Sequence, residues 1–380
     1  MKTIEDIKDL KGKTVLLRAD FNVPMNNGKI TDSFRIDKTL KTIDFALKSG
    51  GLLTIVSHLG SDGKETLLPV YKYLKKKKYD ISFFAGPINE KTVAIINSER
   101  DTKIVLVENL RVNKGEKKND TTFAKTLSKL GDIYVNDAFS VSHREHASVV
   151  GVPKHLKSYA GFQLVDEIQN LSLVSVPVHP FMFILGGNKF STKLPLLSKF
   201  TKKADSFFLG GALLNDMLYA GGFQIGKSLA EKEPKMEKEL QKLYTNKKCI
   251  TPDDVVVERN GKSKNVLIHE VAKTDSIYDA GHDAMKNIIL SVENSKLVLW
   301  NGPLGKSSKG YDLASRKLLK VLAKACESKK TKVIIGGGDS IALVSKMKLH
   351  DAFSFVSTGG GAMLDFLTKG TLPGIKALGR

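Results

Sequence analysis

The sequence predicts an α/β protein built from two Rossmann-like, three-layer α/β/α domains, each with a parallel sheet. Apolar runs of strand length alternate with polar or glycine turns and with segments whose apolar residues recur three and four positions apart. This is the pattern of βαβ units. The chain has 380 residues, of which 41% are hydrophobic. That length exceeds what one core usually supports, so we expect two domains joined by a hinge helix.

In the first half of the chain, the expected strands end in residues that can bind an anion. The strands are Val15–Leu17, Leu52–Val56, Ile104–Val107 and Ile133–Val135, and helical patterns cover Ile36–Lys48 and Phe123–Leu130. The residues beyond the strand ends include Asp20, Asn22, His58, Arg111 and Arg144. Arginine binds phosphate or carboxylate through two N–H groups at once. The first half is therefore predicted to bind a compact phosphorylated acid.

Residues 161–180 are expected to connect the two domains. Phe162–Gln169 has the pattern of a helix, and Val174–Pro180 is a linker that contains prolines. This assignment leaves residues 1–160 for the N-terminal domain and residues 181–365 for the C-terminal domain.

In the second half, four apolar runs each break into glycines and then become helical in pattern. The runs with their turns are Phe181–Leu185 with Gly186–Lys189, Phe207–Leu209 with Gly210–Ala212, Val333–Ile335 with Gly336–Ser340, and Phe353–Val356 with Ser357–Gly361. Further helical patterns cover Leu213–Ala220, Met236–Tyr244 and Leu318–Ala325. A glycine turn that opens a helix lets backbone N–H groups approach an anion. Four such turns predict a rim of strand ends around a nucleotide-like polyphosphate.

The segment Gly221–Ser228 matches the Walker A pattern of nucleotide-binding loops, but its surroundings argue against that function. A Walker A loop follows a strand and opens a helix. Here the preceding Leu213–Ala220 is helical in pattern, and Pro234 follows soon afterwards. We interpret the segment as a glycine stop at the end of a helix that leads into a connecting turn.

Composition argues against several other classes of protein. The formal net charge is +20, but the lysines are scattered, which favours a surface that steers anionic substrates over one that binds nucleic acid. No apolar run approaches the roughly 18 residues of a membrane span, and the N-terminus lacks the apolar stretch of a signal peptide. Cys249 and Cys326 are too few for a disulfide framework. We therefore expect a cytoplasmic protein without nucleic-acid or membrane partners.

Ordered motifs across nearly the whole chain resemble the phosphoglycerate kinase family. They are Arg18–Pro24, Ser57–Gly60, Glu108–Arg111, Asn136–Phe139, His143–Ser148, Trp300–Pro303, Gly336–Ser340 and Ser357–Ala362. The resemblance implies a hinge-bending glycolytic kinase that transfers a phosphoryl group reversibly between 1,3-bisphosphoglycerate and ADP, giving 3-phosphoglycerate and ATP. It implies that the N-terminal domain binds the phosphoglycerate and the C-terminal domain binds the Mg²⁺ complex of ADP or ATP. It also implies that residues 366–380 return to the N-terminal domain, and it favours a monomer.

The resemblance also implies roles for particular residues. The residues expected to bind the phosphoglycerate are Asp20, Asn22, Arg35, His58, Arg111 and Arg144. The residues expected to bind the nucleotide are Gly187, Lys189, Lys193, Gly211, Asn301, Pro303, Gly337, Gly338, Asp339 and Ser340, with Asp339 near the Mg²⁺. The residues expected to take part in catalysis are Arg35, Lys193, Gly338 and Gly361.

The chain departs from the family pattern at several positions. Ser61 stands where an arginine usually follows Ser-His-Leu-Gly, and Asn188, Thr192 and Ala212 replace an alanine, an aspartate and a glycine. A glutamate that usually holds the ribose is missing from Gly305–Ser308, where Asp312 is the only acid nearby. These departures predict altered nucleotide affinity. They also keep open two alternatives, a catalytically degenerate binding protein and a different small-molecule kinase on the same scaffold.

Some of the motif residues have simpler interpretations. Asp20 and Asn22 could cap a turn. His143 and His146 could be buried and satisfied, or could form a metal pair. Arg18 directly follows a buried apolar run, so an ion pair inside the protein is at least as well supported as contact with a ligand.

Overall fold

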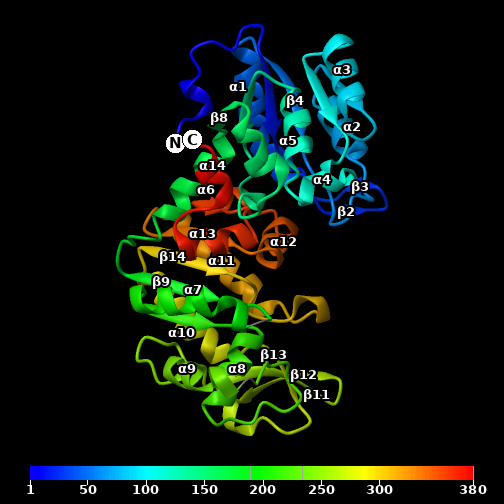
Figure 1. Cartoon of the computed structure of the whole chain (residues 1–380). Coiled ribbons are helices and arrows are strands. Elements are labelled where there is room, and N and C mark those ends of the chain that lie inside the picture. Colours follow the sequence, from blue (N-terminus) through cyan, green and yellow to red (C-terminus); the bar gives the residue numbers. More distant parts are fainter. Residues whose placement is uncertain (189, 233, 380) are drawn as a thin grey trace. The chain divides into compact units, whose positions relative to one another are not determined.

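The computed structural model describes residues 1–188, 190–232 and 234–379. The chain divides into two compact units (Figure 1). Unit 1 comprises Met1–Gln169 together with Lys369–Arg380, and unit 2 comprises Asn170–Thr368. The division falls within helix α6 (Phe162–Ser172). Residues 161–169 of the expected connection thus group with unit 1, and residues 170–180 group with unit 2.

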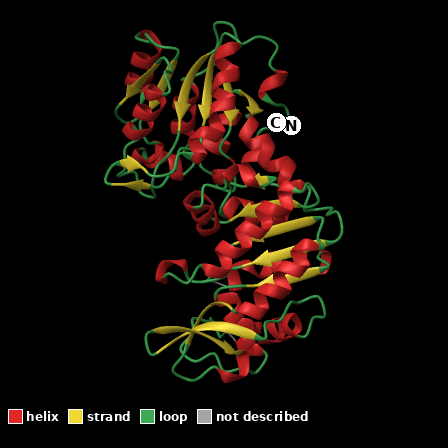
Figure 2. Ribbon diagram, turned by 180° about the vertical axis from the view of Figure 1, so that it is seen from behind, coloured by secondary structure: helices red, strands yellow, loops and turns green. Residues whose placement is uncertain are grey.

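The centre of unit 1 is a sheet of six parallel strands in the order β5-β6-β4-β1-β7-β8. Strands are drawn as yellow arrows in Figure 2. The strands are β1 (Thr14–Arg18), β4 (Leu52–Val56), β5 (Ile81–Phe84), β6 (Ile104–Val107), β7 (Ile133–Asn136) and β8 (Lys157–Ala160). β1 pairs with β4 on one side and with β7 on the other, so the strand order reverses there. Open α/β sheets bind ligands outside the carboxyl ends of their strands at such a switch point.

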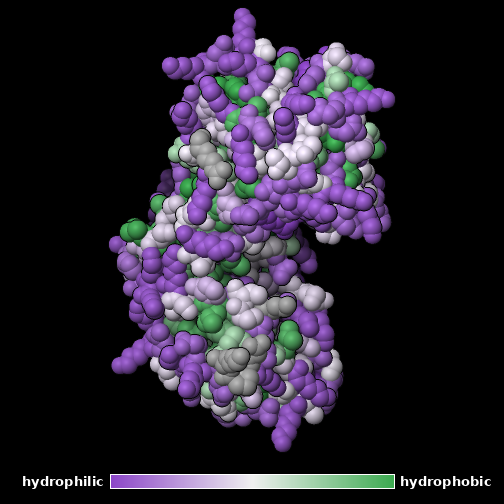
Figure 3. All heavy atoms as spheres, viewed as in Figure 1, coloured by the Kyte–Doolittle hydropathy of each residue, from purple (hydrophilic) through white to green (hydrophobic). Residues whose placement is uncertain are grey.

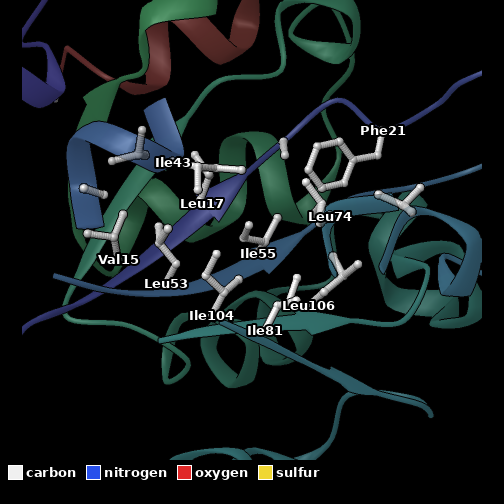
Figure 4. Packing of buried hydrophobic residues seen from close by; sticks show 14 of the residues in the cluster. Val15, Leu17, Phe21, Ile43, Leu53, Ile55, Leu74, Ile81, Ile104 and Leu106 are labelled. Carbon is white, nitrogen blue, oxygen red and sulfur yellow. The ribbon is translucent and has the colours of Figure 1, made fainter. Parts of the chain in front are cut away.

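The strands of this sheet form because their residues are apolar and buried on both faces, as is typical of parallel sheets. All four residues of β6 are buried. On one face, Ile43 of helix α1 (Phe34–Lys48) belongs to the same apolar cluster as Val15 and Leu17 of β1 (Figure 4). The predicted α/β class and the predicted helix over Ile36–Lys48 are confirmed.

Helices complete unit 1, and side-chain caps fix where several of them begin. Besides α1, they are α2 (Leu68–Lys76), α3 (Glu90–Ser98), α4 (Lys114–Lys117), α5 (Thr121–Ser128) and α14 (Pro373–Ala377), and a short hairpin joins β2 (Met25–Asn26) to β3 (Lys29–Ile30). Asp120 accepts a hydrogen bond from the Phe123 amide at 2.7 Å, which satisfies a free N–H group at the start of α5. Gly374 of α14 donates its N–H to the Ser142 carbonyl at 2.8 Å, which ties the C-terminal segment to unit 1.

Unit 2 contains a sheet of five parallel strands in the order β10-β9-β14-β15-β16. The strands are β9 (Phe181–Leu185), β10 (Ser206–Leu209), β14 (Leu297–Asn301), β15 (Lys332–Gly336) and β16 (Phe355–Val356). The helices are α7 (Phe190–Lys203), α8 (Ala212–Ala220), α9 (Pro234–Tyr244), α10 (His282–Glu293), α11 (Leu313–Glu327), α12 (Gly338–Lys346) and α13 (Gly361–Lys369). The switch point lies between β9 and β14. As predicted, each of the four glycine turns leads into a helix: α7, α8, α12 and α13.

Two parts of unit 2 differ from the sequence-based expectation. The strand expected over Phe353–Val356 is confined to Phe355–Val356, because the preceding residues form a 3₁₀ turn at His350–Ala352. The sequence-based expectation also did not include a second sheet, which is antiparallel and has the order β12-β11-β13. Its strands are β11 (Asp254–Arg259), β12 (Lys262–Leu267) and β13 (Ser276–Ala280).

Hydrophilic residues cover most of the face visible in Figure 3, in keeping with the formal net charge of +20. Among the described residues, no helix combines the length and the apolar character that crossing a bilayer requires.

Candidate functional site

Four arginines act electrostatically on one buried histidine at the carboxyl ends of the unit 1 strands. His58 follows β4 and is only 3% exposed. Burial lowers the pKa of His58 well below its usual 6.5, and Arg18, Arg111, Arg144 and Arg35 lower this pKa further. We call these four arginines the arginine rim. Because the imidazole stays neutral while the guanidinium groups stay charged, the rim offers net positive charge to an anion.

Asp20 and Arg35 form an ion pair within this site. Arg35 Nη1 donates to Asp20 Oδ2 at 2.7 Å, and the Arg35 side chain is 24% exposed whereas that of Asp20 is 4% exposed. The Asn22 N–H group lies 3.3 Å from Asp20 Oδ1, a local turn contact of the kind that the simpler interpretation expected. The carboxylate thus orients the Arg35 guanidinium, which has five N–H donors and remains partly open to solvent.

Arg18 lies at the end of β1 and is 1% exposed. Its Nε donates to Ser148 Oγ at 2.9 Å, and its Nη2 lies 3.2 Å from His58 Nδ1. Ser148 Oγ in turn donates to Glu116 Oε1 at 2.6 Å. Burial lowers the pKa of Arg18 and raises the pKa of Glu116. The direct ion pair expected for Arg18 is not found among the described residues, because the Ser148 hydroxyl stands between the guanidinium and the Glu116 carboxylate.

Asn22 and Arg111 both bind the backbone of Gly60, two residues after His58. The Asn22 Oδ1 atom accepts from the Gly60 N–H group at 3.0 Å, and Arg111 Nη1 donates to the Gly60 carbonyl. Burial is the largest cause that lowers the pKa of Arg111, and the neighbouring Arg144 is the next. Arg111 therefore stands close to other cations.

Arg144 is the exposed member of the arginine rim. Its Nε lies 3.5 Å from His143 Nε2. His146 is 14% exposed and lies 3.9 Å from the Glu116 carboxylate. The part of the chain that the structure describes holds no group of three or more His, Cys, Asp or Glu side chains suited to a metal ion, so nothing there supports a metal pair at these histidines.

In unit 2, glycines line the carboxyl ends of β9 and β14, where the turns pack too tightly for side chains. A Cβ atom at Gly186 would lie 1.9 Å from the Pro303 carbonyl oxygen, and one at Gly302 would lie 2.4 Å from the Gly186 carbonyl oxygen. The Gly186 N–H group donates to the Asn301 carbonyl at 2.9 Å. Two separate turns are thereby held together at the switch point of the sheet.

Lys193 of α7 reaches back over this turn. Its Nζ donates to the Gly186 carbonyl and lies 3.5 Å from Asn301 Oδ1. A Cβ atom at Gly187, whose φ is +128°, would lie 2.5 Å from this Nζ. Burial lowers the pKa of Lys193 to about 8, whereas Asp339 acts to raise it. A glycine at position 187 therefore leaves room for the Lys193 ammonium group, which is partly buried.

A pocket of about 550 Å³ opens beside these turns. Its walls include Gly211, Pro303 and Asp339, and Ile277 and Tyr278 from the antiparallel sheet. Three of the residues predicted to bind a nucleotide therefore share one cavity. Its mixed polar and apolar lining suits a base joined to a charged chain.

The far wall of the pocket carries the segment that lacks the expected glutamate. Ser307, Ser308 and Asp312 line it. Asp312 is 4% exposed, and its Oδ1 atom accepts from Arg316 Nε at 2.8 Å and lies 2.7 Å from Arg316 Nη2. Among the described residues of this wall, the one carboxylate is therefore already paired with a guanidinium.

The remaining predicted residues of unit 2 lie at helix starts or outside the described residues. Gly337 precedes α12, Gly338 and Gly361 are the first residues of α12 and α13, and Ser340 is fully buried. Among the described atoms, Ser340 Oγ has no hydrogen-bond partner. Lys189 lies outside the described residues.

The Walker-like segment Gly221–Ser228 is not a phosphate loop. The Phe223 N–H group donates to the Leu218 carbonyl at 3.0 Å, and the Gly222 N–H group donates to the Tyr219 carbonyl at 3.0 Å, while Gly222 has φ +87°. These two bonds with a left-handed glycine form a Schellman motif, which ends a helix. The interpretation of this segment as the glycine stop of α8 is confirmed.

Sequence reasoning missed the contribution of β13 to the pocket. Asn260 (φ +53°) and Gly261 (φ +71°) form the turn between β11 and β12. Asn-Gly is a strong signal of a two-residue hairpin turn, and it could have revealed this sheet. Nothing in the local sequence could have placed Ile277 and Tyr278 in the pocket, because their neighbours there are distant in the chain.

Comparisons with known proteins agree with this geometry. The family model described as phosphoglycerate kinase matches residues 4–370. The chain is similar to the phosphoglycerate kinase of Orientia tsutsugamushi (strain Boryong), with 40% identity over 391 residues that cover 97% of this chain and 96% of the relative. It is 37% identical to that of Leptospira biflexa over 387 residues, which cover 98% and 96% of the two chains. Among solved structures, the phosphoglycerate kinase of Coxiella burnetii superposes with a TM-score of 0.82 and 34% identity, covering 99% of this chain and 98% of the other.

Proposed function

The chain belongs to the phosphoglycerate kinase family, and from this premise we propose which side chains carry the reaction and how they act. The protein transfers a phosphoryl group reversibly between 1,3-bisphosphoglycerate and ADP, forming 3-phosphoglycerate and ATP. This transfer needs no covalent nucleophile from the protein. It needs in-line positioning of the reactants and cations at the oxygens where charge develops.

The arginine rim binds the phosphoglycerate in this proposal. Arg35, which Asp20 orients, neutralises charge at the reacting end of the acid. Arg111 and Arg144 bind the remaining anionic groups, and Asn22 and His58 shape the site. The proposal is supported by the contacts of Arg18 with His58, of Arg35 with Asp20 and of Arg111 with Gly60. All four guanidinium groups also lower the pKa of His58, and such a concentration of positive charge favours an anion with several charges.

The turns of unit 2 bind the nucleotide in the same proposal. Gly187, Gly211, Asn301 and Pro303 pack against the polyphosphate and the base, together with Gly337. Gly338, Ser340 and Gly361 lie at the starts of α12 and α13. The backbone N–H groups there face the phosphoryl group that is being transferred.

Lys193 is the cation that follows the transferred phosphoryl group. Its ammonium is held by the Gly186 carbonyl and is partly desolvated. A charge interacts more strongly in such an environment than in water. A phosphate oxygen in the site would therefore gain a strong partner without a large rearrangement of the protein.

Asp339 fits a magnesium ion that arrives with the nucleotide. Mg²⁺ is usually bound by one or two carboxylates together with substrate phosphates rather than by a complete protein cage, and the exposed Asp339 lines the pocket. When bound, the ion neutralises charge on the phosphate oxygens. We further propose that the protein acts in the cytoplasm as a monomer, with these small molecules as its partners.

The observation that carries the proposal is the joint presence of the arginine rim, Lys193 over its glycine turn, and Asp339 in the pocket. Purified protein should form 1,3-bisphosphoglycerate from 3-phosphoglycerate and Mg-ATP in a coupled assay, and the same assay with GTP measures base preference. Calorimetry should detect binding of each substrate alone. If both substrates bind and no turnover appears, the protein is a degenerate relative and our assignment of catalytic roles is wrong.

A further inference from the structure

In the loop that follows His58, two successive backbone carbonyl groups each accept a hydrogen bond from a cationic side chain. Arg111 Nη1 donates to the Gly60 carbonyl, and Lys117 Nζ donates to the Ser61 carbonyl. Lys117 is the last residue of α4 and is exposed. The two cations come from different segments of the chain and meet at neighbouring peptide groups, so the ammonium lies directly beside the arginine rim.

The loop that carries these carbonyls is held firmly. Asn109 Nδ2 donates to the Leu59 carbonyl at 2.7 Å and to the Glu65 carbonyl at 2.8 Å. Gly60 has φ +68°, and a Cβ atom there would lie 2.0 Å from the Glu65 carboxylate. Because both ends of the loop are fixed by one side chain, the Ser61 carbonyl has a defined position, and so has the ammonium bound to it.

The positive charge of Lys117 also adds to that of the arginine rim. The pKa of His146 is lowered to about 4, by burial first and then by Arg144, Arg18, Arg111 and Lys117. The nearest acidic neighbour in sequence, Glu116, is buried and accepts from the Ser148 N–H and Oγ groups at 2.9 and 2.6 Å. Within the described ranges, no carboxylate lies at ion-pairing distance from Lys117. Its charge is therefore not neutralised by the protein.

We propose that Lys117 is a further substrate-binding residue, which contacts an anionic group of the phosphoglycerate beside Arg111. An ammonium has three N–H donors, and the Ser61 carbonyl takes one of them. Ser61 itself offers only a neutral hydroxyl to this edge of the site, so the cation there is supplied by α4. This inference rests on the proposed function, because it names a ligand of the same site.

The test compares four proteins: the unchanged chain, Lys117→Met, Lys117→Arg and the matched control Lys118→Met. Lys118 is the next residue, is exposed and carries the same charge, so its loss changes the net charge equally without removing the contact. Calorimetry measures the Kd for 3-phosphoglycerate without nucleotide, and the coupled assay measures KM and kcat for both substrates.

We expect Lys117→Met to raise the Kd and the KM for 3-phosphoglycerate by about tenfold, equivalent to about 1.4 kcal/mol. The KM for ATP and the kcat should change little, since the contact serves binding of the acid. Lys117→Arg should stay within about threefold of the unchanged protein because the charge remains. Lys118→Met should also stay close to the unchanged protein.

The inference fails if Lys117→Met leaves the affinity unaltered, or if Lys118→Met loses as much, since the loss would then reflect net charge alone. It also fails if Lys117→Arg falls as far as Lys117→Met. Failure of the proposed function gives a different result, in which the unchanged protein itself does not bind 3-phosphoglycerate.

Discussion

Replacing Lys193 by methionine should make unit 2 more stable while removing most of the activity. The side chain lies over the turn after β9, and burial lowers its pKa to about 8 from its usual 10.5. This difference corresponds to about 3 kcal/mol at about 1.36 kcal/mol per pH unit. This free energy is the amount by which folding disfavours the charged form of Lys193 relative to its neutral form. Methionine has a similar length and carries no charge.

The net gain should be smaller than this figure, because the replacement also removes a bond. Without the ammonium, the Gly186 carbonyl loses a partner, which costs about 1–2 kcal/mol. A net stabilisation of about 1–2 kcal/mol remains. For a unit of this size it corresponds to a rise in Tm of about 2–8 °C. In contrast, kcat should fall by about 10²-fold or more, because the charge serves the transition state most.

The stability of the two proteins should also depend on pH in different ways. The pKa of Lys193 is lower in the folded protein than in the unfolded chain, so the unfolded chain holds the proton more tightly. The free energy of unfolding of the unchanged protein should therefore rise between about pH 8 and pH 10.5. Lys193→Met should lack this rise.

Thermal unfolding at a series of pH values, combined with the coupled assay, measures both effects. Lys202→Met is the matched control, because Lys202 is an exposed lysine of the same helix and its loss should change neither Tm nor kcat appreciably. A Lys193→Met protein that is less stable than the unchanged chain at neutral pH would refute the reasoning, since it would show that the ammonium is a net stabilising group.

Three further predictions concern the Walker-like segment, the ribose and closure of the enzyme. Lys227→Ala should alter kcat less than twofold because the segment ends a helix, and a loss as large as that of Lys193→Met would restore it as a phosphate loop. The missing glutamate would stand at Ser308 or one residue before it. Ser308→Glu or Ser307→Glu should therefore tighten ADP binding by up to about tenfold in calorimetry. Unaltered affinity in both variants would mean that the ribose is held elsewhere. Because direct transfer requires the bound substrates to meet, small-angle scattering should show compaction only with both present, and an unchanged radius would contradict closure.

Several central strands were predicted with their observed bounds, for a physical reason. The predicted runs Leu52–Val56, Ile104–Val107 and Phe181–Leu185 have the same bounds as β4, β6 and β9. Strands buried on both faces are continuously apolar and end where polar residues begin, so their bounds can be read from the local sequence. The antiparallel sheet was missed because its edge strand β12 is largely exposed and lacks such a run.

The positions of the candidate site residues could be predicted, but their partners could not. Strand ends are visible in the sequence, and the rule that ligands bind there led to both halves of the candidate site. Which groups then pair depends on residues far apart in the chain. Arg18 meets Ser148 across 130 positions, and no local pattern announces this contact. Asp312 and Arg316 are only four residues apart. The sequence alone still does not select this pair, because other charged residues are available to each of them.

The return of the C-terminal segment to unit 1 has a consequence for synthesis. Unit 2 is one continuous stretch, Asn170–Thr368, whereas unit 1 also needs Lys369–Arg380. Gly374 in that segment packs so closely against Ser142 that a Cβ atom would lie 2.9 Å from the serine Cβ. A ribosome delivers this segment only after all of unit 2 has been made. The unit whose residues emerge first is therefore the last to be completed, and a nascent chain can finish its second unit while its first still lacks a part.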